Sequence, residues 1–420
     1  MIYFTTRNRR SFKRLLCYDS GPDPSMTIHS QSNRKPSICF VALDNFAALA
    51  DDPTYGHIGG AEIQQVLIGK NLAKRGYRIS FITLDHGQDD EIEIEGMRII
   101  KAYKPNVGVR MLRFLHPRLT SLWHAMKRAD ADIYYQRTSD STTGIMAAFC
   151  RRYGRKFIFA VASDYDCLTD PPRRLTRHAR ILYHYGLRRA NLVIAQTVTQ
   201  QKLLCENFCI NSTVIPNCAP DYGRCAGDGK GQAPDRGRRL LWIGAFTPVK
   251  RLELLLDVAE QLQDLQFDVV GDGNSESEYV QHLRWRAKTI RNVHLHGMLP
   301  HASVHQFYQQ SAALICTSRA EGFPNTFLEA WSYGLPIVST FDPDDLIADK
   351  GLGIVGKDVS ELTTGIRELL ESPEQWRKTS QSAREYFMEN HTPNKVMERF
   401  ERIFCEVVNS ACKNGDGESV

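Results

Sequence analysis

Short apolar runs alternate with helical segments along most of the chain, and this alternation constrains the fold more than any other feature. The apolar runs lie at 38–43, 79–83, 133–135, 157–161, 192–195, 240–243, 267–270, 293–295, 314–316 and 337–338. Runs of this kind, without polar alternation, are typical of strands buried on both faces of a parallel sheet. The segments between them have helical periodicity, as at 61–75, where Gly76 marks the end of the helix. The sequence therefore predicts an α/β protein built on doubly wound parallel sheets.

The stretch from Pro216 to Arg239 interrupts the alternation with glycine, proline and little apolar mass, which is typical of a linker. A chain of 420 residues is too long for one ordinary core, so we expect two domains. The predicted organisation is a disordered basic leader at 1–36, an N-terminal Rossmann-like domain at 37–218, a linker at 219–238, a C-terminal Rossmann-like domain at 239–390, and a terminal helix with a tail at 391–420.

Composition and charge exclude several classes of protein. The net charge is +5, and seven Lys/Arg against two acids in the leader account for all of it. A nucleic-acid binder would place its excess on the folded part, so we expect no nucleic-acid partner. No apolar run approaches the ~18 residues of a membrane span. The eleven cysteines form no CxxC pair, and no secretion signal precedes them, which favours reduced thiols and a cytoplasmic location.

Two carboxylates, Glu321 and Glu329, flank a Gly-x-Pro turn that follows the apolar run at 314–316. The turn opens a helix, and the first N–H groups of a helix bind phosphate because they lack partners and the dipole favours anions. Two acids would repel a phosphate unless they address another part of the same ligand, such as a sugar diol. A nucleotide-sugar supplies diphosphate, ribose and hexose together.

Lys250 and Arg251 follow the strand at 240–243 and precede the helix that carries Leu252. Two cations beside a helix N-terminus oppose the dipole, and an anionic ligand would relieve that cost. A solvated basic turn is the alternative.

Two glycine-rich loops indicate close approach of a ligand to the backbone. Gly59 and Gly60 open the helix at 61–75, where they would admit a phosphate or a sugar, although an ordinary turn explains them nearly as well. Gly271 and Gly273 follow the strand at 267–270 but lack the third glycine of a dinucleotide fingerprint, so we interpret them as a tight turn.

Asp164 and Asp166 form a D-x-D pattern, which binds manganese in another class of sugar transferases. The same spacing recurs at Asp130–Asp132 and Asp342–Asp344, so the pattern has little specificity. We expect an acceptor-side or structural role for Asp164 and no metal.

Two basic amphipathic segments in the first half could lie on an anionic membrane. A helix that covers the sheet with a solvated basic face is the favoured interpretation, and peripheral membrane contact is the alternative. Their basic residues are Arg110, Arg113, Arg118, Lys127 and Arg128 in one segment, and Arg173, Arg174, Arg177 and Arg180 in the other.

Taken together, these motifs resemble the retaining nucleotide-sugar glycosyltransferases of the GT-B fold, specifically glycosyltransferase family 4. Glu321 to Glu329 is similar to the E-x(7)-E motif of that family, and the similarity extends to Val338. Supporting segments are Trp242-Ile243-Gly244, Val270-Gly271-Asp272-Gly273, His296-Gly297, Cys316-Thr317-Ser318 and Ile215-Pro216-Asn217. The resemblance covers the chain from Ile38 to about Val408. It implies two Rossmann-like domains that face each other across a cleft, with the last helix crossing back to the first.

The resemblance also implies roles for individual residues. Lys250 would neutralise the departing diphosphate, Glu321 would face the transferred sugar, Glu329 would hold the ribose, and Asp164 would contact sugar or acceptor. The implied donor-binding residues are Gly59, Gly60, Arg251, Gly271, Gly273, Phe323, Asn325, Thr326 and Glu329. The chain departs from the family at Ala245, where an arginine is common, and at Ser163, near a common histidine.

The implied reaction is transfer of a hexose from a nucleoside-diphosphate sugar to a hydroxyl of a saccharide or lipid-linked acceptor, with retention and without a cofactor. The setting would be polysaccharide or glycolipid biosynthesis. A nucleotide-sugar epimerase or a phosphorylase of the same architecture remains an alternative. A non-catalytic nucleotide-sugar-binding protein is another, because of Ala245, but the presence of Lys250, Glu321 and Glu329 favours an enzyme.

Overall fold

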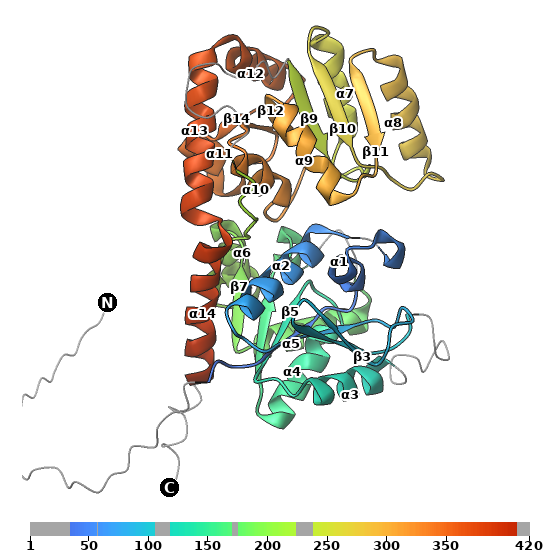
Figure 1. Ribbon diagram of the computed structural model, residues 1–420, viewed down its shortest axis with the longest axis vertical. Helices are drawn as coiled ribbons and strands as arrows, with labels where there is room; N and C mark the ends of the chain where they lie inside the picture. The colour runs from blue at the N-terminus through green and yellow to red at the C-terminus, as the bar shows by residue number, and fades with distance from the viewer. Residues whose placement is uncertain (1–33, 57, 106–117, 170–174, 224–237, 410–420) are drawn as a thin grey trace, which may run out of the picture. The chain divides into compact units, whose positions relative to one another are not determined.

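The computed structural model describes residues 34–56, 58–105, 118–169, 175–223 and 238–409 (Figure 1). Residues 1–33 of the predicted leader, 224–237 of the predicted linker and 410–420 of the predicted tail lie outside this part. The domain boundaries therefore stay predictions.

The first half forms an eight-stranded sheet in the order β3-β4-β2-β1-β5-β6-β7-β8. Its strands are β1 (Ile38–Val41), β2 (Ile79–Thr83), β3 (Glu91–Ile94), β4 (Met97–Lys101), β5 (Ile133–Arg137), β6 (Lys156–Ala160), β7 (Leu192–Ala195) and β8 (Thr213–Val214). Its helices are α1 (Phe46–Ala50), α2 (Gly60–Lys74), α3 (Thr120–Ala129), α4 (Thr142–Tyr153), α5 (Arg177–Arg189) and α6 (Val198–Phe208), with short 3-10 turns η1 (Pro53–Tyr55) and η3 (Asp164–Cys167).

The second half forms a six-stranded sheet in the order β11-β10-β9-β12-β13-β14, all parallel. Its strands are β9 (Arg239–Ile243), β10 (Gln266–Val270), β11 (Val293–Gly297), β12 (Ala313–Cys316), β13 (Ile337–Ser339) and β14 (Gly353–Val355). Its helices are α7 (Leu252–Gln261), α8 (Glu278–Thr289), α9 (His301–Gln310), α10 (Asn325–Ser332), α11 (Leu346–Lys350), α12 (Val359–Glu371) and α13 (Pro373–Asn390), with a 3-10 turn η4 (Pro343–Asp345).

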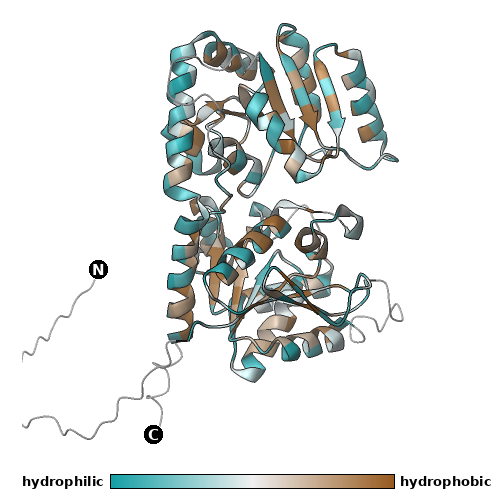
Figure 2. Ribbon diagram, in the orientation of Figure 1, coloured by the Kyte–Doolittle hydropathy of each residue, from teal (hydrophilic) through white to brown (hydrophobic). Residues whose placement is uncertain are grey.

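Helices cover both faces of each sheet, as a doubly wound fold requires. Residues of α1 and α2 join one core cluster of the first sheet, and residues of α3 to α6 join the other. In the second sheet α7, α8 and α12 lie on one side, and α9, α10, α11 and α13 on the other. Apolar residues concentrate on the strands, whereas the helices carry both kinds (Figure 2). The predicted fold, two Rossmann-like domains, is confirmed.

The first sheet differs from the prediction in one respect, because it is not wholly parallel. β3 pairs antiparallel with β4, with Glu91 opposite Ile100. The turn between them consists of Glu95 and Gly96, with φ of 49° and 74°. Positive φ at both central residues is typical of a type I′ hairpin turn.

The last helix, α14 (Pro393–Asn409), belongs to the core of the first half although it follows the second half in sequence. Arg75 at the end of α2 forms an ion pair of 2.7 Å with Glu401 of α14. The apolar face of α14 that joins this core consists of Val396, Met397, Phe400, Ile403, Phe404 and Val407.

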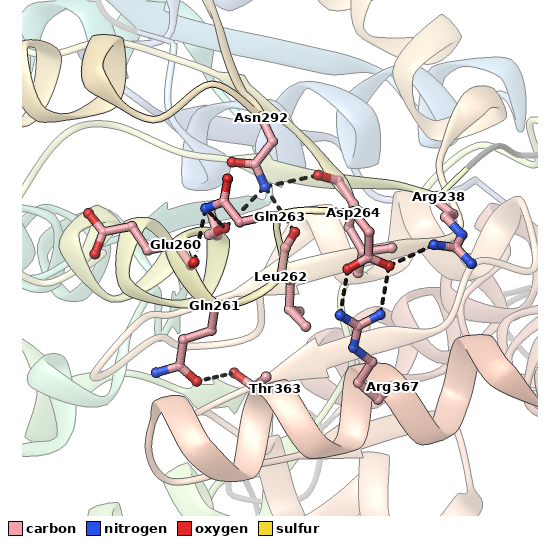
Figure 3. A network of polar contacts seen from close by, with 11 residues as sticks. Arg238, Glu260, Gln261, Leu262, Gln263, Asp264, Asn292, Thr363 and Arg367 are labelled. Carbon is pink, nitrogen blue, oxygen red and sulfur yellow. Dashed lines mark hydrogen bonds and ion pairs between the residues drawn. The ribbon is translucent and has the colours of Figure 1, made fainter.

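A polar network closes the C-terminal end of α7 (Figure 3). The side-chain amide of Asn292 donates to the carbonyl oxygens of Ala259, Leu262 and Leu265 at 2.9 to 3.0 Å. Asp264 next to them accepts from Arg367 of α12 and from Arg238. The last carbonyls of a helix lack partners within the helix, and Asn292 supplies them with a buried donor. The Ala259 carbonyl also accepts from Gln263, and the Leu262 carbonyl from the Leu265 amide.

Candidate active site

Two neighbouring strands of the second sheet fix the loop that carries Lys250. Trp242, on β9, donates its indole N–H to the Thr317 hydroxyl at 3.0 Å. The same hydroxyl donates to the Lys250 carbonyl at 2.7 Å. Thr317 follows β12 and is fully buried. Because β9 and β12 are adjacent in the sheet, this relay holds Lys250 at the carboxyl edge.

The ammonium group of Lys250 forms an ion pair with the Glu321 carboxylate. Their side chains are 30% and 16% exposed. Four residues after Glu321, α10 begins at Asn325, and its N-cap Pro324 supplies no side-chain cap. The structure therefore places a cation of one loop against a carboxylate of the next, shortly before the start of a helix, and the roles of Lys250 and Glu321 towards a donor stay predictions.

Arg251 is the N-cap of α7, in a left-handed conformation with φ of 48°. Its guanidinium donates to the Thr317 carbonyl at 2.7 Å and to the Thr340 hydroxyl at 2.6 Å. These bonds hold Arg251 against the loop after β12. Its predicted contact with the donor stays a prediction.

Glu329 lies on α10 and is 8% exposed. One carboxylate oxygen accepts from Nε2 of His301 at 3.1 Å, and the other accepts from the Tyr308 hydroxyl at 2.8 Å. The bond to Glu329 raises the pKa of His301. Both partners lie on α9. The sequence does not indicate them, because no local spacing predicts that α9 packs against α10.

Asp164 begins the η3 turn in the first half and accepts a 3.0 Å hydrogen bond from the Gln200 side chain. Burial raises its pKa to about 6, and the carboxylates of Asp344, Asp166 and Glu321 contribute to that rise. Asp166, the second acid of the D-x-D pattern, instead accepts from Ser139 and from the Ala162 and Ser163 amides. It is structural. The described ranges hold no group of three or more His, Cys, Asp or Glu residues arranged to bind a metal.

The predicted glycines differ in what lies next to them. The Gly60 carbonyl accepts from the Asn325 side chain at 3.0 Å. A Cβ on Gly271, whose φ is +132°, would lie 1.9 Å from the Gly244 carbonyl oxygen. A Cβ on Gly273 would lie 2.7 Å from Val280. The close approach that Gly271 and Gly273 permit is thus to the chain itself, and their donor contacts stay predictions.

Phe323 is buried, and Asn325 and Thr326, the first two residues of α10, are half-buried. The Phe323 ring is 6% exposed and packs on His391, with ring centres 5.2 Å apart. Only its backbone is left for a ligand. The Asn325 side chain accepts from Gln64 at 3.2 Å.

The basic segments are described in part. Arg110, Arg113, Arg173 and Arg174 lie outside the described residues. The other basic residues lie in or near α3 and α5, which cover the first sheet. Within the described ranges no helix combines the length and the apolar character needed to cross a membrane.

Comparisons with known proteins agree with this arrangement. Residues 58–221 match the family model described as Glycosyltransferase Family 4, and residues 237–372 match the model described as Glycosyl transferases group 1. The amylovoran biosynthesis glycosyltransferase AmsD of Erwinia amylovora is 28% identical over 39% of this chain. That match covers 47% of AmsD, about half of its length.

Two solved structures share the fold over most of the chain. Sucrose-phosphate synthase from Thermosynechococcus elongatus superposes with a TM-score of 0.71 at 15% identity, covering 90% of this chain and 100% of that one. Anabaena HepE, solved with UDP and glucose, superposes with a TM-score of 0.69 at 17% identity, covering 88% of this chain and 100% of HepE. The two family matches and the shared fold place the chain among the glycosyltransferases of the GT-B fold.

Proposed function

We propose that this protein is a retaining glycosyltransferase of family 4 that moves a hexose from a nucleoside-diphosphate sugar to an acceptor hydroxyl in polysaccharide or glycolipid biosynthesis. The observation that carries the proposal is the Lys250–Glu321 ion pair beside the uncapped start of α10. The names of AmsD, a biosynthetic glycosyltransferase, and of HepE, solved with UDP and glucose, support the substrate class.

The chemistry follows from where charge develops. When the bond between the sugar C1 and the β-phosphate oxygen breaks, negative charge collects on that phosphate. Lys250 and the first N–H groups of α10 stabilise this charge, which is electrostatic catalysis by fixed groups. Glu321 holds the Lys250 ammonium in place and faces the transferred sugar. The positive charge that stabilises the departing phosphate comes from Lys250 and from the start of α10, and no metal is assigned a role.

The acceptor oxygen bonds to C1 on the face from which the diphosphate leaves, and its proton passes to the departing phosphate oxygen. This sequence retains the anomeric configuration and needs no enzyme nucleophile. Asp164 lies within electrostatic range of Glu321, so we assign it to the acceptor side.

Glu329 binds the ribose in this proposal. His301 and Tyr308 each occupy one hydrogen-bond acceptor position, on different oxygens of the Glu329 carboxylate. A carboxylate has about four acceptor positions, so two remain for a vicinal diol.

The test begins with a thermal-shift panel of UDP-, GDP- and ADP-sugars. A ligand at a hundred times its Kd stabilises the folded state by about 2.7 kcal/mol, so a specific donor is readily detected. The responding donor is then incubated with saccharide acceptors, and the anomeric coupling constant of the product is measured by NMR. A panel without any response, or a product of inverted configuration, would refute the proposal. Incubation with the donor alone, followed by a search for an epimer or for phosphorolysis, distinguishes the proposed glycosyltransferase from an epimerase or a phosphorylase.

A non-catalytic nucleotide-sugar-binding protein is a second candidate, favoured by one observation. Ala245 removes the arginine common in the family, and the Arg251 guanidinium is hydrogen-bonded to the backbone of Thr317 and to Thr340. Donor binding without transfer or hydrolysis across the acceptor panel would favour this candidate.

A further inference from the structure

Arg137 is a buried cation that the proposed reaction does not use. It is the last residue of β5, which lies between β1 and β6 in the first sheet. It is 6% exposed. Ligands of open α/β sheets bind at the carboxyl ends of the strands, which is where Arg137 lies.

No carboxylate of the described residues forms an ion pair with the guanidinium of Arg137. Its Nη2 donates to Asn217 Oδ1 at 2.7 Å, while its Nε is buried without a partner among the described residues. Burial lowers its pKa, and electrostatic interactions with Tyr135 and with the carboxylates of Asp166 and Glu62 oppose this shift. Arginine does not lose its proton in proteins, so the charge remains and its burial is costly.

The backbone next to Arg137 is strained. Thr138 has a φ of 79°, which is a rare conformation for a β-branched residue. Strained backbone of this kind is found preferentially at ligand sites.

The start of α2 adjoins the same region. Gln64 of α2 exchanges two hydrogen bonds with the backbone of Cys218, at 2.7 and 3.1 Å. Cys218 follows Asn217, the partner of Arg137. The N-cap of α2 is Gly59, which offers no side chain to the first N–H groups of the helix. An uncapped helix start of this length favours an anion.

We propose that Arg137, held by Asn217 beside the start of α2, forms a subsite for one anionic group, a phosphate or a carboxylate, of a substrate bound at the first sheet. The inference deepens the proposed function and rests on it for the identity of that substrate. The anion belongs either to the donor diphosphate or to a charged acceptor.

The experiment uses the full chain, with inorganic phosphate and pyrophosphate as probes. Arg137→Met removes the charge and roughly keeps the volume, and Arg137→Lys keeps the charge but loses the planar fork. Arg155→Met is the matched control, because Arg155 is already paired with Asp130 and Asp132. Melting temperature and probe affinity are measured for each variant.

We expect the wild type and Arg155→Met to be stabilised by at least one probe, whose affinity falls tenfold or more in Arg137→Met and less in Arg137→Lys. Without a probe, Arg137→Met should melt no lower than the wild type, because removal of an unpaired buried charge outweighs the loss of the bond to Asn217 Oδ1. A lower melting temperature would mark Arg137 as structural and overturn the inference. An unchanged probe affinity in Arg137→Met, or a wild type that binds neither probe, would also overturn it.

UDP separates the two sources of the anion. If Arg137→Met weakens UDP binding together with phosphate binding, the subsite takes the donor diphosphate. If UDP affinity is retained, the subsite takes an anion of the acceptor. The phosphate titration needs no nucleotide-sugar, so a chain that binds phosphate through Arg137 but no nucleotide-sugar refutes only the proposed function.

Discussion

Replacing Thr317 by valine tests how the fold positions Lys250. The Thr317 hydroxyl accepts from the Trp242 indole and donates to the Lys250 carbonyl, at 3.0 and 2.7 Å. Valine has nearly the same shape, so the change leaves no cavity but removes both bonds. Trp242 is 2% exposed, and its N–H would stay buried without an acceptor. An unsatisfied buried group costs about 1–3 kcal/mol, so two affected groups should lower the free energy of unfolding by roughly 2–4 kcal/mol.

Urea denaturation measures this change through the midpoint at constant slope. Thr363→Val is the matched control, because the half-buried Thr363 hydroxyl donates to the Val359 carbonyl one turn earlier in α12 at 2.6 Å. The Gln261 side-chain oxygen lies 3.4 Å from the same hydroxyl (Figure 3). Water can replace a bond at such a position, so we expect a change within about 0.5 kcal/mol. The relay from Trp242 to Lys250 would be refuted if Thr317→Val cost no more than this control.

The remaining predictions concern the donor site, the response to pH and the network of Figure 3. Glu329→Ala should weaken donor binding at least tenfold in calorimetry while the fold survives, and unchanged affinity would contradict a role in holding ribose. Burial lowers the pKa of His391 to about 4, so the unfolded state takes up a proton first as the pH falls. The free energy of unfolding should therefore decrease by about 3 kcal/mol between pH 6.5 and 4, and His391→Gln should flatten that part of the profile. Asn292→Ala should lower the free energy of unfolding by roughly 1–3 kcal/mol, because three carbonyls near the end of α7 lose a buried donor, while those of Ala259 and Leu262 keep a second one. Gln263 lies at the same helix end but is exposed, so Gln263→Ala should lower the free energy of unfolding far less. Equal losses of stability in the two variants would show that burial does not determine the size of the effect.

The fold was largely predictable from the sequence because its strands are buried on both faces. The unbroken apolar runs of β1, β2 and β9 identify central strands without any knowledge of their neighbours. The β3–β4 hairpin was missed because β3 alternates exposed glutamates with isoleucines, a pattern of period two. The signal was present, since Glu95-Gly96 between two such runs is typical of a hairpin turn.

The candidate site was predictable only as a set of loops. The spacing of Glu321 and Glu329 around a helix start indicated where a phosphate and a sugar would bind. The groups that orient these residues come from distant segments: Tyr308 lies 21 residues before Glu329, and Trp242 lies 75 residues before Thr317. Such pairs depend on how helices and strands pack, which no local pattern encodes. Arg137 was missed for the same reason, because only its burial reveals a missing counter-ion.

The return of α14 to the first half has a consequence for biosynthesis. The first sheet emerges from the ribosome long before α14, whose apolar side chains fill part of that core. Until residues 393–409 have been translated, part of one face of this sheet remains uncovered and is prone to aggregate. Folding of the amino-terminal half is therefore completed only once α14 has been synthesised, and a gene fragment that stops before α14 should yield insoluble material.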